Sequence, residues 1–534
     1  MTYLGAVSTL ATPQSQPILG STQVANNAGG YAFPVDDWTR LERFLVLGSE
    51  GGTYYVGEQE LTRQNAEAVL RCIQTDANRV VAAAVAISSE GRAPKNDPAL
   101  FVLAMAASLA PTTDERHFAL TVLPGVARTG THLLHFVRYC RQFRGWGRGL
   151  RQAVAAWLEA LPAEALGYQA LKYQQRDGWA LRDLLRLAHP KPRDEDHAAL
   201  YYWLTHGWES VGDEPHPNVA LRQVWAAERL AGTTDAVQAA ALIRTYRLPR
   251  EVVPTALLGE RGIWEALADD MPMTALIRNL ATMTRVGLLA PMSAATLALT
   301  AQLRDEERLR RARVHPLGIL AALKTYAQGH GVRGNATWEP VRQVVDALDE
   351  AFYATFANVP ATGKRIVLAL DVSGSMAGTM VNGVPGLSAR EACAAMALIT
   401  AASEPNYTLC AFDHNFYQLT ISPRQRLDDV VRDVSQVGGG GTNCALPLVW
   451  AHHENIPVDA FVILTDSETW QGAVHPVQAI RTYRQKVGIP AKLITVAMAA
   501  NGVSIGDADD AGMMNCVGFD THTPALIADF ITRN

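Results

Sequence analysis

The stretch from Arg365 to Met376 reads R-I-V-L-A-L-D-V-S-G-S-M, and it decides how the second part of the chain is interpreted. Its apolar run, Ile366 to Leu370, is typical of a strand buried in the middle of a sheet. The carboxyl end of that strand then carries Asp371, Ser373 and Ser375. Since a carboxylate and hydroxyls are hard oxygen ligands of the kind that Mg²⁺ prefers, the stretch predicts part of a divalent-cation site.

Two later segments supply the remaining ligands that such a site needs. Glycines at 438–441 come before Thr442, and glycines let a backbone approach closely. A second apolar run, F-V-I-L-T, is followed by Asp466. The simpler alternative, in which Asp371 and the serines only cap a tight turn, does not explain Thr442 and Asp466. We therefore expect one divalent cation, Mg²⁺ or alternatively Mn²⁺ or Ca²⁺, held by Asp371, Ser373, Ser375, Thr442 and Asp466.

The sequence around these ligands has the pattern of an α/β domain. After a linker at Asn358–Gly363, strand-like and helix-like runs alternate. Strands are expected at Ile366–Leu370, Tyr407–Phe412, Ala460–Thr465 and Ala491–Ala499. Helices are expected from a capping box at Ser388 to about Ser403, and at Leu427–Val437, Val477–Val487 and Pro524–Ile531. The alternation predicts a doubly wound, Rossmann-like parallel sheet over residues 361–534, which binds ligands beyond the carboxyl ends of its strands.

The first part of the chain has a helical pattern instead. From about Trp38 to Phe356, apolar residues recur at helical spacing, and short turns with Pro or Gly separate the runs. One example is the series Leu150, Val154, Trp157, Leu158 and Leu161. So many short amphipathic helices predict an all-α helical-repeat domain over residues 26–358. Residues 1–25 are poor in charge, and we expect them to form a flexible N-terminal arm.

Composition excludes several broad classes of protein. The chain has 534 residues, 48% of them hydrophobic, and a net charge of −5, so its overall charge does not indicate nucleic-acid binding. Its six cysteines are scattered, which is typical of reduced, buried thiols and not of a disulfide framework or a zinc site. No basic residue precedes Arg40, and apolar stretches such as Val80–Ile87 are shorter than the roughly 18 residues of a membrane span. We expect a cytoplasmic protein that does not enter a membrane.

Local charge is more informative than the total. Between Arg138 and Arg193 there are eleven Lys or Arg residues and only four acidic ones, with aromatic residues between them. Lys172 and Arg176 are four residues apart, as are Arg182 and Arg186, so on a helix each pair would share a face. Lys and Arg side chains can neutralise phosphates, and aromatic side chains can stack on bases, so their combination is typical of RNA binding. The alternative is a solvated arginine face with its aromatics packed inward, and we expect Trp157 and Trp179 to belong to the core.

Several long motifs together resemble a known family. They are G-W-G-R-G-L-R (145–151), K-Y-Q-Q-R-D-G-W (172–179), D-L-L-R-L-A-H (183–189), M-P-M-T-A-L-I-R-N-L (271–280), H-P-L-G-I-L-A-A-L-K-T-Y (315–326) and D-V-S-G-S-M (371–376). Their order resembles the Ro autoantigen family, in a bacterial form, whose helical part is the TROVE domain. The five expected metal ligands resemble the metal-ion-dependent adhesion site of von Willebrand factor A domains.

The resemblance implies a fold and a function. HEAT-like TROVE helices would close into a ring, and the von Willebrand factor A domain would join its two ends. The protein would be a non-catalytic, monomeric RNA-binding protein that binds small non-coding Y RNA and single-stranded 3′ ends of misfolded RNA. It would act in RNA quality control and decay as a ribonucleoprotein, with a protein such as an exoribonuclease docking at the metal. The family's RNA contacts fall on Lys172, Arg176 and His189, to which the basic segment adds Arg148, Arg151, Arg182 and Arg186.

Two other functions fit parts of the sequence. A metal-dependent protein-interaction scaffold without RNA would account for the metal ligands, but it leaves the uncompensated arginines unexplained. A metal-dependent hydrolase would need a general base, and no evident nucleophile–base pair accompanies Asp371 or Asp466.

Overall fold

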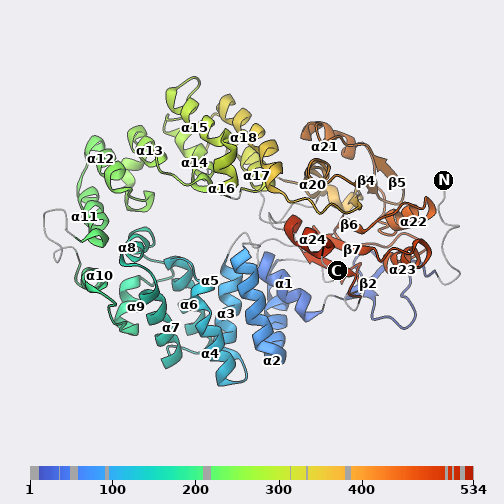
Figure 1. Ribbon diagram of the computed structural model, residues 1–534, viewed down its shortest axis with the longest axis horizontal. Helices are drawn as coiled ribbons and strands as arrows, with labels where there is room; N and C mark the ends of the chain where they lie inside the picture. The colour runs from blue at the N-terminus through green and yellow to red at the C-terminus, as the bar shows by residue number, and fades with distance from the viewer. Residues whose placement is uncertain are drawn as a thin grey trace.

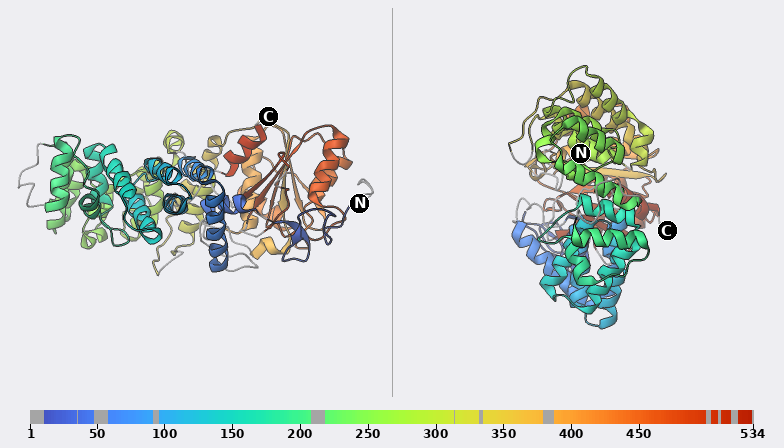
Figure 2. Two further views of the ribbon diagram at one scale, coloured as in Figure 1. Left: turned by 90° about the horizontal axis from the view of Figure 1, so that it is seen from below. Right: turned by 90° about the vertical axis from the view of Figure 1, so that its left-hand side faces the viewer.

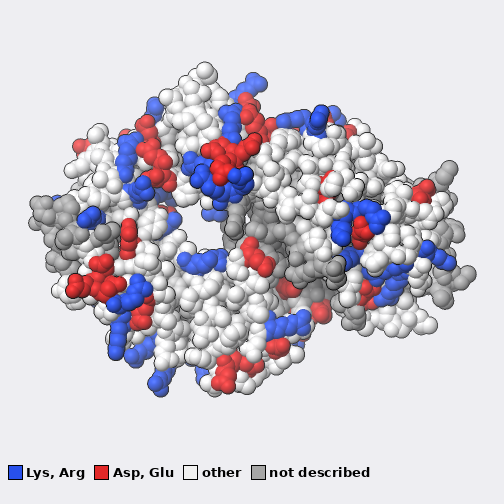
Figure 3. All heavy atoms as spheres, viewed as in Figure 1, with Lys and Arg blue, Asp and Glu red and all other residues white. Residues whose placement is uncertain are grey.

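The computed structural model describes residues 11–532 except 35, 48–57, 91–95, 208–217, 313, 332–334, 379–386, 499–502, 508–509 and 518–522. Two parts are evident in Figure 1: an arc of helices that forms most of a ring, and an α/β domain that lies between the two ends of the arc. We call the first part the helical ring and the second the α/β domain. Figure 3 shows an opening that passes through the ring.

The helical ring consists of short helices that pack on their neighbours in the chain. Their apolar faces point inward as predicted, because Val154, Trp157 and Leu158 are all buried. Leu181, Leu184 and Leu185 are buried in the same way on a later helix. The helices are α1 (Asp37–Leu47), α2 (Glu58–Glu90), α3 (Asp97–Leu109), α4 (Thr113–Thr121), α5 (Leu123–Val126), α6 (Gly130–Phe143), α7 (Arg148–Ala160), α8 (Ala163–Lys172), α9 (Leu181–Ala188), α10 (Glu195–His206), α11 (Val219–Gly232), α12 (Ala236–Tyr246), α13 (Arg261–Ala268), α14 (Met273–Arg285), α15 (Ala294–Arg304), α16 (Glu306–Arg311), α17 (Pro316–Ala327) and α18 (Arg342–Ala354).

The α/β domain is built on a six-stranded sheet in the order β5-β4-β3-β6-β7-β9. All neighbouring strands are parallel except β5, which is antiparallel to β4. The register places Leu368 of β3 opposite Leu409 of β4 and Val462 of β6. The strands are β3 (Ile366–Asp371), β4 (Tyr407–Phe412), β5 (Phe416–Leu419), β6 (Ala460–Thr465), β7 (Lys492–Ala497) and β9 (Met513–Val517).

Helices cover both faces of this sheet (Figure 2). Alternate residues of β3 enter different cores, because Leu368 and Leu370 pack with residues of α20 and α21, whereas Val367 and Ala369 pack with residues of α22 and α23. A strand buried on both sides accounts for the continuous apolar run that the sequence shows. The helices are α19 (Gly374–Gly378), α20 (Ala389–Ser403), α21 (Leu427–Ser435), α22 (Leu446–His453), α23 (Pro476–Val487) and α24 (Thr523–Thr532).

The predicted doubly wound domain is therefore confirmed, with corrections at its margins. The strands expected near Ile366, Tyr407, Ala460 and Ala491 are β3, β4, β6 and β7, and the capping box at Ser388 begins α20. Sequence patterns did not predict β5, β9 or α22. The sheet is also not wholly parallel, because the short turn at 413–415 folds β5 back beside β4.

The N-terminal segment differs from the flexible arm that was expected. Of the predicted arm, residues 1–10 lie outside the described residues, while residues 11–25 are bonded to the α/β domain. Two short strands, β1 (Val24–Ala25) and β2 (Tyr31–Pro34), pair with each other, and β2 pairs with β8 (Val503–Ser504). Side-chain amides make many of these contacts, so the polar composition that suggested mobility instead supplies hydrogen bonds.

The α/β domain contacts both ends of the helical ring. At the far end of the ring, Lys324 of α17 pairs with Glu391 of α20 at 2.9 Å. Asp349 of α18 pairs with Arg426 at 2.6 Å, beside the start of α21. At the near end, α1 contacts β9, and β2 leads directly into α1. The two attachments agree with the expectation that this domain joins the ends of a ring.

The cysteines of the chain are reduced and lie in its interior. All six cysteines are free and buried. Burial raises the pKa of the Cys72 thiol to about 11, so this group stays protonated. Among the residues that the structure describes, no helix combines the length and the apolar content needed to cross a bilayer.

Candidate functional site

Two carboxylates end neighbouring strands at the carboxyl edge of the sheet. Asp371 is the last residue of β3, and Asp466 directly follows β6. Because β3 and β6 are adjacent and parallel, their ends carry both side chains to the same edge. Both are buried, with exposed fractions of 0% for Asp371 and 2% for Asp466. The sequence-predicted carboxylate pair is thus brought together.

Ser373 lies in the turn between β3 and α19, and Ser375 is the second residue of α19. The backbone N–H of Ser373 donates to Asp371 Oδ1 at 2.9 Å, which fixes the turn. The hydroxyl of Ser373 is 3.3 Å from that of Ser375. Burial raises the pKa of Asp466, and a hydrogen bond from Ser375 to that carboxyl partly opposes the rise. Ser375 therefore links the residues that follow β3 to the residue that follows β6.

The glycine loop that precedes Thr442 packs against the turn that follows β3. The N–H of Gly439 donates to the carbonyl oxygen of Val372 at 2.8 Å, so the loop lies against the β3 turn. Gly438 has a φ of +90°, and a Cβ at this position would overlap the side chain and backbone of Val372. Thr442 is consequently held in the interior, with an exposed fraction of 3%. Glycine is needed here for the close approach and for the backbone conformation.

The electrostatics of the cluster favour a cation. Burial, followed by the charge of Asp466, raises the pKa of Asp371 to about 7. Burial likewise raises the pKa of Asp466. Two desolvated carboxylates repel each other, and a divalent cation between them would remove that cost. The residues present therefore fit a hard cation, since two carboxylates and three hydroxyls supply only oxygen ligands.

Further residues hold the expected ligands in position, and sequence reasoning did not single them out. The hydroxyl of Thr465 donates to Asp371 Oδ2 at 2.6 Å. Asp413, which follows β4 and is buried, accepts from the N–H of Gly440 at 3.0 Å. The position of Asp413 at a third strand end was the available signal, because β4 neighbours β3 in the sheet.

The N-terminal segment supports the same loops from outside. Gln14 donates from Nε2 to Asn443 Oδ1 at 2.7 Å, next to Thr442. Asn27 donates from Nδ2 to Glu468 Oε1 at 3.0 Å, and the N–H of Glu468 in turn donates to Asp466 Oδ1 at 3.1 Å. Segments that are more than 400 residues apart in the chain therefore stabilise together the loops that carry the expected ligands.

The predicted RNA-binding arginines lie on α7 and α9. Arg148 and Arg151 are exposed in the first turn of α7, while Arg182 and Arg186 are exposed on α9, four residues apart as expected. Arg151 Nε donates to the carbonyl oxygen of Ala188 at 3.3 Å, so it contacts the end of α9. None of these four arginines forms an ion pair with another described residue.

The predicted shared helix face of Lys172 and Arg176 is wrong. Helix α8 ends at Lys172, and Arg176 lies in a tight turn that two backbone hydrogen bonds with Trp179 close. The Lys172 ammonium lies 5.6 Å from the ring centres of Tyr168 and of Tyr173. Helix α8 ends here because Tyr173 has non-helical backbone angles, with φ of −119° and ψ of 58°. The chain then turns back through Asp177 and Gly178 at positive φ.

His189 occupies the residue after α9. It is exposed and has a left-handed backbone conformation with a φ of 50°, and its N–H donates to the carbonyl oxygen of Leu185. Because Arg151 contacts the neighbouring Ala188, the start of α7 and the end of α9 present Arg151 and His189 on adjoining elements. No direct contact joins Lys172 to His189 among the described residues.

Lys172 faces a large cavity of about 810 Å³ between α8, α12 and α14. The other cations in its lining are Arg244, Arg247, Arg250 and Arg278. Arg247 pairs with Asp270 at 3.2 Å and Arg244 pairs with Asp269 at 2.8 Å, so these two are partly neutralised. Figure 3 shows Lys and Arg side chains both beside the central opening and at the outer margin of the ring.

The aromatic residues of the basic segment are mostly structural, as expected. Trp157 is buried, and its Nε1 donates to the carbonyl oxygen of Ala127 at 2.5 Å. Trp179 packs against the core with one face toward Arg141, whose guanidinium lies 5.0 Å from the ring centre. Arg138 is neutralised by Asp177 at 3.0 Å. The exposed cations outside these contacts are accessible to a ligand.

Family models match both parts of the chain. The TROVE domain model matches residues 24–209 and 216–325. The Ro60 vWA domain model matches residues 365–531. The two models together cover most of the sequence and divide it, as the fold does, into a helical part and an α/β part.

Individual proteins resemble the chain over nearly its full length. RNA-binding protein RO60 of Deinococcus radiodurans is 43% identical over 528 residues, which is 99% of this chain and 98% of that protein. RNA-binding protein RO60 of Caenorhabditis elegans is 36% identical over 97% of this chain and 92% of that protein. The crystal structure of the Deinococcus radiodurans RO (RSR) protein superposes with a TM-score of 0.77 at 42% identity, covering 93% of this chain and 99% of that one.

Proposed function

We propose that this chain, which belongs to the RO60 family, binds RNA on its helical ring and a divalent cation on its α/β domain. RNA binding is supported by a set of exposed or half-buried cations on and beside α7–α9. These cations have no carboxylate partner among the described residues. They are Arg148, Arg151, Lys172, Arg176, Arg182 and Arg186, with His189 beside them.

These side chains suit the sugar–phosphate backbone of RNA. Arginine offers a planar fork of N–H donors that matches a phosphate, and each neutralised phosphate releases counterions. The chain carries a net charge of −5, so RNA would be attracted to this region and not to the surface as a whole. The affinity should therefore depend steeply on salt concentration.

The finer proposal concerns which RNA is bound and the purpose of binding. We infer that small non-coding Y RNA lies on the cations of α7–α9 and that single-stranded 3′ ends of misfolded RNA enter the opening of the ring. The opening in Figure 3, with Lys and Arg beside it, supports the second part. The protein would act without catalysis, as the ribonucleoprotein component that holds aberrant RNA for quality control or decay.

The metal site has a separate role in this proposal. Mg²⁺, or Mn²⁺ or Ca²⁺ in its place, would be held by Asp371, Ser373, Ser375, Thr442 and Asp466. When bound, the cation supplies a Lewis acid that can accept a carboxylate from a partner protein, such as an exoribonuclease. The protein's own part is to bury the ligands, and Thr465, Asp413 and Asn27 stabilise the loops that carry them.

Electrophoretic mobility shifts with a structured small RNA test the RNA proposal. Lys172→Ala combined with Arg176→Ala should weaken binding, and the slope of log affinity against log salt should fall by about 1 for each phosphate that is no longer neutralised. Arg310→Ala combined with Arg342→Ala removes the same charge elsewhere on the ring and should leave the affinity nearly unchanged. Equal affinity of the wild type and the first variant would contradict the proposed site.

The protein-interaction scaffold without RNA is the second candidate function. The specific observation in its favour is the cluster of buried or half-buried oxygen groups, which fits capture of a partner's acidic group and needs no nucleic acid. Purification of the full chain from its own cell separates the two. A protein partner recovered in stoichiometric amount without RNA, and absent from the Asp371→Ala purification, would favour the scaffold.

A further inference from the structure

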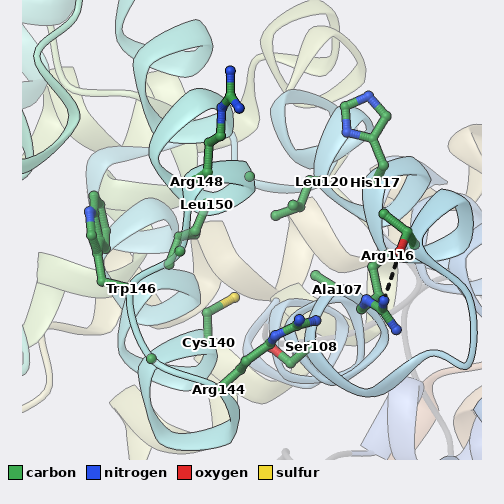
Figure 4. A pocket seen from close by; sticks show the side chains of 14 residues that line it. Ala107, Ser108, Arg116, His117, Leu120, Cys140, Arg144, Trp146, Arg148 and Leu150 are labelled. Atoms are coloured by element: carbon green, nitrogen blue, oxygen red, sulfur yellow. Dashed lines mark hydrogen bonds between the residues drawn. The ribbon is translucent and has the colours of Figure 1, made fainter.

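A second cavity lies in the helical ring, away from the metal site and from Lys172. It has a volume of about 370 Å³ and lies between α3, α4, α6 and the start of α7. Figure 4 shows that side chains from these four elements converge on it. No Asp or Glu contributes to this lining, which includes Arg116, His117, Arg144, Trp146 and Arg148.

The arginines around the cavity differ in how far they are already used. Arg116 donates to the carbonyl oxygens of Ala110 and Pro111 at 2.6 and 3.1 Å, so it is held at the end of α3. The side chains of Arg144 and Arg148 are exposed, and neither forms a hydrogen bond or ion pair with another described residue. On the neighbouring helix α4, the acidic Glu115 is occupied by its capping contacts with Thr112.

The rest of the lining is apolar and aromatic. Leu120, Cys140 and Leu150 form the floor, and in Figure 4 Trp146 stands on one side of them and His117 on the other. Burial raises the pKa of the Cys140 thiol, so this group acts as an apolar surface and not as a nucleophile. A pocket with an apolar floor, an aromatic wall and cations at its rim is suited to a flat, anionic ligand.

Two glycines determine the conformation of the loop that carries Trp146 and lines this cavity. Gly145 has a φ of +91°, which turns the chain sharply between α6 and α7. Gly149 lies against Leu120, and a Cβ at Gly149 would come within 2.9 Å of the Leu120 Cδ1 atom. The turn places Arg144 and Arg148 on either side of Trp146 in sequence, so the aromatic wall and both cations belong to one short segment.

The pocket also adjoins the surface proposed for RNA. Arg148 lines the pocket, and Arg151 lies one turn further along α7 and contacts the end of α9. An RNA backbone that follows the cations from α9 to the start of α7 therefore arrives at the mouth of the cavity. A single nucleotide that leaves the RNA helix at this point would find both phosphate ligands and an apolar place for its base.

We propose that the cavity between α4, α6 and α7 binds one unpaired nucleotide of the bound RNA, with Arg144 at its phosphate and Trp146 against its base. This inference rests on the proposed RNA binding and adds a selective subsite to it. A base in a duplex cannot enter a cavity of this kind, because it is stacked and paired. The pocket would therefore favour RNA with a bulge or a loose end over fully paired RNA.

Adenosine 5′-monophosphate and inorganic phosphate test the pocket directly, by calorimetry on the full chain. The wild type should bind the nucleotide more tightly than phosphate. Arg144→Ala should weaken both by about tenfold, since a charge-assisted hydrogen bond is removed. Trp146→Leu should weaken only the nucleotide, by about fivefold or more, since only the stacking surface is removed. Arg342→Ala serves as the charge control and should change neither.

Two hairpin RNAs then separate this inference from the proposed function. One hairpin is fully paired and the other carries a single unpaired nucleotide, and the ratio of their affinities is measured for each variant. The wild type should prefer the bulged hairpin, and Arg144→Ala and Trp146→Leu should reduce that preference. Equal nucleotide and phosphate affinities in the wild type, or an unchanged preference in both variants, would overturn the inference. Failure of the wild type to bind either hairpin would instead contradict the proposed RNA binding. In that case the calorimetry alone tests whether the cavity binds a nucleotide.

Discussion

At the scale of single residues, the paired carboxylates define the α/β site. Asp371 and Asp466 are buried side by side at the ends of β3 and β6, and each has a raised pKa. A site with this arrangement is costly for the folded protein when it contains no cation. Metal binding should therefore be visible as a change in stability as well as in occupancy.

The first prediction concerns the pH dependence of that change. The folded pKa of Asp371, about 7, lies above its unfolded value near 4, so the folded state binds a proton more readily. The free energy of unfolding of the metal-free protein should fall as the pH rises from about 4 to 7 and stay low above that. Thermal unfolding at pH 5 and pH 8 measures this, and added Mg²⁺ should raise the Tm more at pH 8.

Asp371→Asn is the matched control for this prediction. It keeps the shape of the side chain and removes one of the two charges. The metal-free variant should be more stable than the metal-free wild type at pH 8, and Mg²⁺ should no longer raise its Tm. The same Mg²⁺ response in the variant and the wild type would show that Asp371 is not a ligand.

A second residue-scale prediction concerns the glycine loop. Gly438→Ala should destabilise the protein by about 1–3 kcal/mol and weaken Mg²⁺ binding, because Gly438 has a φ of +90° and its Cβ would overlap Val372. Gly439 has a similar positive φ but open space around the position of a Cβ, so Gly439→Ala should cost less. Chemical denaturation of both variants measures whether Gly438→Ala destabilises the protein more than Gly439→Ala. An equal destabilisation would argue against the close contact with Val372.

Residue types and their order were enough to predict which side chains follow the ends of β3 and β6. Asp371, Ser373, Ser375 and Asp466 lie where the strand-end pattern placed them, and Thr442 lies on the loop packed against them. The geometry of the basic segment was less predictable. The spacing of Lys172 and Arg176 suits a helix, but α8 ends at Lys172 because Tyr173 leaves the helical conformation, and Arg176 belongs to the following turn.

At the scale of elements, the N-terminal segment is the main difference from the prediction. Its Gln and Asn side chains bond to residues around 443 and 468–475, which are more than 400 positions away. Contacts over such a distance leave no periodic signal in the sequence, whereas β3, β4 and β6 are predictable because both faces of each strand are buried over most of its length. The short edge strand β5 was missed because it lacks such an apolar run.

Asn27→Ala tests the role of this segment. The change removes a donor to the buried carboxylate of Glu468, and we expect a decrease of about 1–3 kcal/mol in the free energy of unfolding. Mg²⁺ affinity should also fall several-fold, because the Glu468 N–H donates to Asp466. Gln16→Ala is the control, since the contacts of Gln16 are made by its main chain. Unchanged Mg²⁺ affinity in Asn27→Ala would mean that the segment does not stabilise the site.

At the scale of the whole molecule, the two candidate sites lie on different parts of one closed structure. The α/β domain joins the ends of the helical ring through α1, α17 and α18, and it carries the expected metal ligands. The exposed cations and the cavity proposed to bind a nucleotide lie on α3–α9, in the lower left of the ring in Figure 1. Closure of the ring depends on contacts between segments distant in sequence, so the sequence indicated it only through a family resemblance.

We propose that RNA lies on α7–α9 and not on the α/β domain. Ultraviolet crosslinking of a bound small RNA to the full chain, followed by mass spectrometry of the crosslinked peptides, tests it most directly. We predict crosslinked peptides from residues 144–189, retained in Asp371→Ala and reduced in Lys172→Ala combined with Arg176→Ala. Crosslinks confined to residues 361–534, or abolished by Asp371→Ala, would contradict RNA binding on α7–α9 of the helical ring.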